Sequence, residues 1–267
     1  MGTGVKDLNR VLKNQSRLTQ NKIKPIKADK KFNLDLIQSR TDLTHMTRRL
    51  RTAKSLGFSL CISGSPGTGK SVYGRYLAGQ LKLPVLQKRA SDLFGMYVGQ
   101  TEKQIASAFE EANDTKSFLI FDEADSFLSR REQAHKSWEI SQVNEMLTHM
   151  ESHPLPFMAT TNFAARLDAA SLRRFTFKLE FSELGPERVK LAFKYFFKSD
   201  APTALLRVSN LTSGDFHTVM KKCKILGIKS HDEICAELIA ESDSKKPIHY
   251  PIGFKTDKFI SSSQIGE

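Results

Sequence analysis

Short apolar runs alternate along this chain with longer segments in which apolar residues recur every three or four positions. One such segment carries Ile105, Ala108, Phe109 and Ala112 on one face, which is the spacing of an amphipathic helix. The short runs have the length and the composition of buried strands. Five strands are therefore expected, at residues 58–62, 84–87, 118–121, 156–160 and 176–181.

Alternation of strands and helices favours a parallel sheet covered by helices on both faces. We predict an α/β three-layer P-loop sandwich with a parallel five-stranded sheet as the large domain, residues 46–182. After Phe181 the strand pattern stops, and Pro186 is placed to open a helix. Further helices are expected at 201–208, 214–226 and 231–241, so that a small all-α lid domain spans residues 183–241.

The segments outside these two domains are strongly polar. Residues 1–45 are expected to form a basic arm followed by a linker helix, with a helix over residues 35–54. Residues 242–267 contain Ser, Lys, Pro and Gly and are expected to be a loosely attached tail.

Residues 64–71 carry a phosphate-binding pattern. They follow the first predicted strand and precede a predicted helix, which is the context that this pattern requires. Its glycines allow phosphate to lie against bare backbone amides, Lys70 would place a cation on the β- and γ-phosphates, and Ser71 would offer a hydroxyl to Mg²⁺. A glycine-rich turn without a ligand is the alternative. The predicted nucleotide-binding residues are Gly64, Ser65, Pro66, Gly67, Thr68, Gly69, Lys70 and Ser71.

Two acidic residues follow the apolar run 118–121. A buried strand would place Asp122 and Glu123 at its carboxyl end, beside the phosphate loop. Asp122 is expected to hold Mg²⁺, and Glu123 to orient and deprotonate the attacking water. An acidic helix cap would be the other explanation. The expected cofactors are ATP and Mg²⁺.

From about residue 58 to residue 226 the sequence resembles the AAA+ ATPases, specifically the AAA group and its stand-alone bacterial type. The run 159–162 resembles the polar sensor at the end of a strand in that family, and this resemblance implies a catalytic role for Asn162. The run 167–175 resembles the second region of homology, in which Arg173 and Arg174 would reach the nucleotide of a neighbouring subunit. The two arginines are adjacent here, whereas the family separates them, so only one of them is expected to act.

Two further features come from the same resemblance. Ser213-Gly214-Asp215-Phe216 resembles the lid motif and places Gly214 at the nucleotide, but no arginine follows as a second sensor. The run 91–99 resembles the first pore loop of AAA protein remodellers, with Tyr97, Val98 and Gly99 facing a central channel. The alternative is that Tyr97 packs on its own subunit.

The amino-acid composition limits which partners and which cellular compartment are expected for the protein. The 267 residues carry a net charge of +12, and the basic residues at the N-terminus would suit an acidic partner or nucleic acid, although a solvated helix explains them too. Three cysteines without paired spacing, and no long apolar run, favour a reduced cytoplasmic setting without a membrane. Among the seven histidines there is no metalloprotease motif.

Three functions are compatible with these features, in the following order of preference. The first is an ATP-hydrolysing homo-oligomer, expected to be a hexamer, that remodels a protein client of unknown identity past Tyr97. The second is a DNA-associated ATPase, a loader or translocase, that binds nucleic acid through residues 1–31. The third is a nucleotide-gated scaffold with slow turnover. The presence of the residues expected for hydrolysis, Asp122, Glu123 and Asn162, argues against it.

Overall fold

The computed structural model describes residues 32–95, 97, 99–127, 137–163, 167 and 169–245. The predicted basic arm, Val98 and most of the predicted tail lie outside these residues. A six-stranded sheet forms the centre, in the order β1-β6-β2-β5-β4-β3. Its strands are β1 (Gln38–Ser39), β2 (Ser59–Gly64), β3 (Val85–Arg89), β4 (Phe118–Asp122), β5 (Phe157–Thr161) and β6 (Phe177–Ser182).

The five predicted strands are present and parallel to one another, which confirms the α/β class. The sixth strand, β1, pairs antiparallel with β6 at the edge of the sheet. The predicted helix over residues 35–54 was wrong in part, because this segment forms the 3-10 turn η1 (Leu34–Leu36), then β1, and then α2 (Leu43–Arg51). The side chain of Asp42 caps α2 by accepting a hydrogen bond from the amide of His45 at 2.8 Å, so the helix begins after it.

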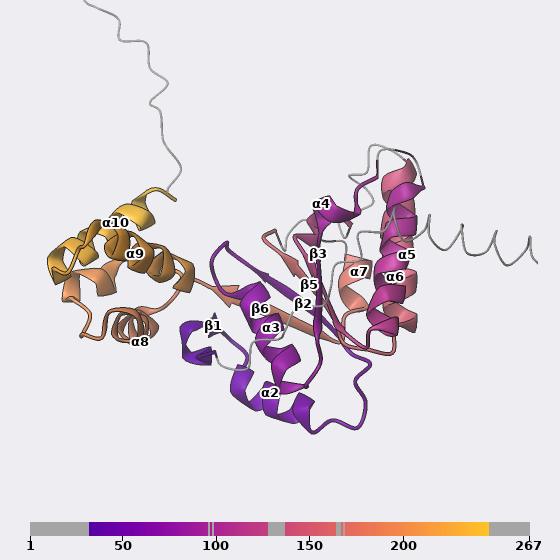
Figure 1. Ribbon diagram of the computed structural model, residues 1–267, viewed down its shortest axis with the longest axis horizontal. Coiled ribbons are helices and arrows are strands. Elements are labelled where there is room, and N and C mark those ends of the chain that lie inside the picture. Colours follow the sequence, from indigo (N-terminus) through magenta and orange to yellow (C-terminus); the bar gives the residue numbers. More distant parts are fainter. Residues whose placement is uncertain are drawn as a thin grey trace, which may run out of the picture.

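Helices cover both faces of the sheet (Figure 1). One face packs against α2 and α3 (Lys70–Gln80), with Tyr73 and Leu77 fully buried. The other face packs against α5 (Gln100–Asp114) and α6 (Ser137–Ser152), with Ile105 and Met146 fully buried. Shorter elements connect them: α4 (Ala90–Leu93), η2 (Ala124–Phe127) and α7 (Ala169–Arg173).

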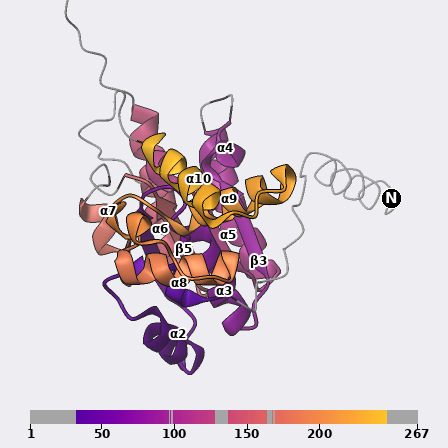
Figure 2. The same ribbon diagram turned by 90° about the vertical axis from the view of Figure 1, so that its left-hand side faces the viewer.

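The segment after β6 is helical and lies to one side of the sheet, as Figures 1 and 2 show. It has its own core around Phe193, Phe216 and Leu238, and Leu36 from η1 packs into that core. Pro186 opens the first helix, as expected. The elements are α8 (Pro186–Phe197), η5 (Thr203–Arg207), α9 (Ser213–Leu226) and α10 (His231–Asp243). None of the helices in the described ranges combines the length and the apolar character that crossing a bilayer requires.

Candidate functional site

The loop between β2 and α3 depends on glycine. Gly64, Gly67 and Gly69 have φ angles of 148°, 81° and 95°, which side-chain-bearing residues rarely adopt. A Cβ on Gly64 would lie 2.0 Å from the carbonyl oxygen of Phe181, and one on Gly67 would lie 2.7 Å from Oγ1 of Thr212. Helix α3 begins at Lys70, so its N-terminal amides and the positive end of its dipole face the loop.

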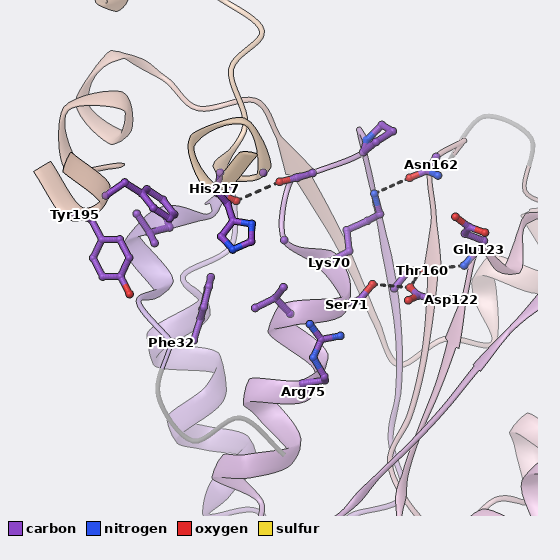
Figure 3. Close-up of a pocket in the computed structure, with 18 residues that line it drawn as sticks. Phe32, Lys70, Ser71, Arg75, Asp122, Glu123, Thr160, Asn162, Tyr195 and His217 are labelled. Atoms are coloured by element: carbon purple, nitrogen blue, oxygen red, sulfur yellow. Dashed lines mark hydrogen bonds between the residues drawn. The ribbon is translucent and has the colours of Figure 1, made fainter. Parts of the chain in front are cut away.

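Lys70 is held inside this loop. Its Nζ donates hydrogen bonds to the carbonyl oxygens of Gly64 at 2.6 Å and Ser65 at 3.0 Å. It also donates one to Oδ1 of Asn162 at 2.8 Å, which Figure 3 shows. Burial lowers the pKa of Lys70, whereas the negative charge of Asp122 acts in the opposite direction. A cation with neutral acceptors only is poised to bind an anion, because anionic oxygens accept stronger hydrogen bonds than carbonyls do.

Asp122 contacts side chains from both neighbouring strands and from the start of α3. Its Oδ1 accepts hydrogen bonds from Oγ of Ser71 and from Oγ1 of Thr160, both at 2.6 Å, and its Oδ2 accepts one from Nε2 of Gln87 at 2.5 Å. The hydroxyl of Ser71 and the carboxylate of Asp122 are hard oxygen ligands that lie within contact of each other. This donor set fits Mg²⁺, which is held in proteins by few side-chain oxygens and by substrate phosphates.

Glu123 follows at the end of β4 with an unusual backbone. Its φ is 59°, in the left-handed region, and its amide donates to Oγ1 of Thr160 at 3.2 Å. Such a conformation costs a non-glycine residue about 1–2 kcal/mol. It turns the chain so that the exposed carboxylate of Glu123 lies beside Asn162 in the cavity (Figure 3).

These residues line one end of a cavity of about 630 Å³. The other end is mainly apolar and was missed by sequence reasoning. Its side chains come from the start of the described chain, from α3, from α8 and from α9: Phe32, Leu36, Val72, Tyr195, Phe196 and His217. The one signal for it in the sequence is an aromatic pair, Tyr195-Phe196, near the end of α8.

Gly214 lies where the two ends of the cavity meet. Its amide donates to the carbonyl oxygen of Gly67 at 2.9 Å, and Oγ of Ser213 donates to the same oxygen at 3.2 Å. The first turn of α9 is thereby attached to the phosphate loop.

The remaining predicted residues lie elsewhere. Arg173 and Arg174 are not among the described residues that line the cavity, and Nη1 of Arg174 pairs with Oε1 of Glu151 at 2.6 Å. Tyr97 is 77% exposed, and Gly99, with a φ of 83°, precedes α5. The structure therefore brings together the predicted phosphate and metal residues with Glu123 and Asn162, and it leaves Arg173, Arg174, Tyr97 and Gly99 outside the cavity.

The parallel sheet, the glycine loop before α3 and the acidic end of β4 define a P-loop nucleotide-binding domain. Residues 60–183 match the sequence profile of the ATPase family associated with various cellular activities (AAA). Residues 60–183 therefore form a domain that is similar to the ATPase domains of the AAA family.

Curated relatives of known name agree with this assignment. A putative 26S proteasome regulatory subunit homologue of Methanothermobacter thermautotrophicus is 34% identical over 142 residues, 51% of this chain and 38% of that protein. Spastin of Drosophila virilis is 31% identical over 167 residues, 58% of this chain and 22% of that protein. The chain thus spans well under half the length of these relatives.

A solved structure shares the fold. The FIGL-1 AAA domain, crystallised in complex with ADP, aligns with a TM-score of 0.61 over 90% of this chain and 92% of that chain, at 20% sequence identity. This structural match covers more of the chain than the sequence profile does, which spans residues 60–183.

Proposed function

We propose that this protein hydrolyses ATP in a Mg²⁺-dependent reaction, assembles into a homo-oligomeric ring, and remodels a protein client. The observation that carries the hydrolytic part is the meeting of five side chains at one end of the cavity: Lys70, Ser71, Asp122, Glu123 and Asn162.

Each of these groups has a distinct task in the proposed reaction. Lys70 would exchange its carbonyl acceptors for phosphate oxygens, and the loop amides would surround the β-phosphate. Ser71 and Asp122 would hold Mg²⁺, which neutralises charge on the phosphate oxygens when bound. Asn162 supplies a neutral amide that can orient a water molecule without adding charge.

Glu123 is the proposed base. It would accept a proton as the water oxygen forms a bond to the γ-phosphorus and the bond from that phosphorus to the β–γ bridging oxygen breaks. The products are ADP and inorganic phosphate. Glu123 suits this role because it is exposed in the cavity, next to the metal-binding Asp122 but without a hydrogen bond to Ser71.

A test separates binding from turnover. Glu123→Gln should retain ATP binding and lose about 10²–10⁴-fold in steady-state hydrolysis, because only proton transfer is removed. Glu110→Gln is the matched control, since Glu110 is exposed on α5 and does not line the cavity. Equal hydrolysis rates for wild type and Glu123→Gln would refute the assignment of the base.

The arginines support the oligomeric part of the proposal. They lie outside their own cavity, and a guanidinium there would be useful to the nucleotide of a neighbouring subunit. Arg174 is paired with Glu151, while within the described part of the chain Arg173 forms no ion pair, which favours Arg173 as the residue acting in trans.

Mixing an Arg173→Ala/Arg174→Ala variant with a Lys70→Ala variant should restore part of the activity. A hydrolysis rate per subunit that is independent of protein concentration, with no restoration, would contradict this.

Tyr97 supports the choice of a protein client. A large aromatic side chain that is 77% exposed can grip varied side chains without reading a sequence. The named relatives include proteasome regulatory homologues, which gives a protein client a further basis by analogy.

The client class can be tested with one variant and one truncation. Tyr97→Ala should keep basal hydrolysis and lose client-stimulated remodelling, whereas Ile225→Ala, at an 82% exposed lid residue, should keep both. Stimulation by DNA that survives Tyr97→Ala, weakens steeply with salt and disappears when residues 1–31 are deleted would favour the nucleic-acid alternative instead.

A further inference from the structure

We propose that Gln87 is a positioning residue for the metal-binding carboxylate of Asp122. The inference rests on the proposed nucleotide site and adds to it a residue outside every motif that identified the site. Gln87 lies in the middle of β3, one strand beyond the strand that carries Asp122.

A short chain of hydrogen bonds runs through Gln87. Nη1 of Arg75 on α3 donates to Oε1 of Gln87 at 3.3 Å, and Nε2 of Gln87 donates to Oδ2 of Asp122 at 2.5 Å. The two ends of the amide thus face groups of opposite character, a guanidinium and a carboxylate. Reversing the amide would place oxygen against carboxylate and NH₂ against guanidinium, so these neighbours select one orientation.

The effect on Asp122 is to give its two oxygens different tasks. Oδ2 is held by Gln87 from β3, whereas Oδ1 faces Ser71, the other proposed metal ligand, and Thr160. Donors from different strands and from α3 thereby fix the plane of the carboxylate. Groups that orient a metal ligand in this way typically change metal affinity by about 10–100-fold when they are removed.

Joining β3 to β4 does not require this side chain. The two strands already pair through their backbones from Val85↔Phe118 to Arg89↔Asp122, and the apolar residues Val85 and Leu86 are fully buried. The hydrogen bond from Gln87 to Asp122 is therefore an addition to a complete ladder. A structural role and a positioning role for Gln87 make different predictions for metal binding.

The experiment measures metal affinity directly. Mn²⁺ is titrated into full-length protein saturated with ADP, with detection by electron paramagnetic resonance, and ADP affinity is measured separately in EDTA. Gln87→Met keeps the length of the side chain and removes both hydrogen bonds. It should weaken Mn²⁺ binding about 10–100-fold, leave ADP affinity in EDTA unchanged, and raise the Mg²⁺ concentration needed for half-maximal hydrolysis.

Two comparisons separate positioning from structure. Lys88→Met removes a neighbouring side chain of the same strand that pairs with Glu111 at 2.7 Å, so it should lower thermal stability and leave Mn²⁺ affinity unchanged. In an Asp122→Asn background, Gln87→Met should have no further effect on Mn²⁺ affinity, because its effect passes through the carboxylate.

The outcomes distinguish this inference from the proposed function. If wild type binds Mn²⁺ with ADP and Gln87→Met binds it equally well, the role of Gln87 is refuted and the nucleotide site stands. If Gln87→Met weakens Mn²⁺ binding equally with and without Asp122, the role of Gln87 is also refuted. If wild type binds neither ADP nor ATP, the proposed function itself fails.

Discussion

The two ends of the cavity are built in different ways. The phosphate end is polar, and its residues lie on the loop before α3 and at the carboxyl ends of the adjacent strands β4 and β5. The other end is mainly apolar, and we call it the base end because we expect it to receive the nucleobase. It combines residues separated by more than half of the chain, from Phe32 to Tyr195. The phosphate end is formed by the sheet and the adjoining loop, whereas the base end needs side chains from the helical region after β6 as well.

This difference assigns separate tasks to the two ends. The phosphate end offers a cation, loop amides and oxygen ligands, all of which favour an anionic, metal-bound group. The base end offers aromatic and aliphatic surface, which suits a planar base by stacking and burial. Substitutions at the two ends should therefore separate the binding of phosphate from the binding of the nucleoside.

The largest effect is expected at Lys70. Lys70→Ala should weaken ATP binding by more than about 100-fold, because charge-assisted hydrogen bonds of about 1.5–3 kcal/mol each are lost. Adenosine binding should be unchanged, since adenosine carries no phosphate. Calorimetric titration of both ligands measures the contrast, and Lys103→Ala on the exposed side of α5 is the control. Loss of adenosine binding in Lys70→Ala would show that the two ends are not separable.

The sequence predicted the phosphate end because its signals are local. Strand β4 is the clearest case: its first four residues are apolar and buried, and the apolar run ends where Asp122 begins. Burial on both faces of a parallel sheet produces that pattern. The edge strand β1 was missed because two residues give no period, and the polar Gln38 and Ser39 lie at the edge of the sheet.

The base end and Gln87 were missed for a different reason. Their positions depend on which segments pack together, and a single glutamine in a strand or an aromatic pair on a helix gives no sign of its distant partner. Gln87 and Asp122 are brought together by a strand order that places β3 beside β4. The roles of Arg173, Arg174 and Tyr97 stay predictions, because a single chain does not contain the neighbour or the client on which they would act.

An intermediate effect is expected at Tyr195. Tyr195→Ala should weaken ATP and adenosine binding by the same factor, about 10-fold, because aromatic stacking on a base contributes about 1–3 kcal/mol. Leu191→Ala is the control, since Leu191 is on the same helix, is similarly exposed and does not line the cavity. The same titrations as for Lys70→Ala give the measurement. A loss confined to ATP would mean that Tyr195 acts on phosphate rather than on the base.

The smallest effect is expected at Gly214, where the two ends of the cavity meet. A Cβ on Gly214 would lie 2.8 Å from Cα of Gly67 and 3.1 Å from its carbonyl oxygen, so the first turn of α9 must move away from the phosphate loop. This movement lengthens the hydrogen bond from the Gly214 amide to Gly67, which is now 2.9 Å. In compensation, alanine is favoured over glycine in a helix by about 0.5–1 kcal/mol.

The weaker contact with Gly67 and the higher helix preference of alanine have opposite effects on the free energy of unfolding. Ligand affinity is therefore a better measure of Gly214→Ala than thermal stability. We expect an unchanged melting temperature and about a 3-fold loss of affinity for both ATP and adenosine, since one hydrogen bond between lid and loop contributes about 0.5–1.5 kcal/mol. Gly57→Ala is the control, because the nearest atom to its added Cβ is 3.4 Å away and Gly57 does not line the cavity. An effect on ATP alone would place Gly214 with the phosphate end. An equal effect on both ligands would show that the contact between α9 and the loop sets how well the base end closes on the nucleoside.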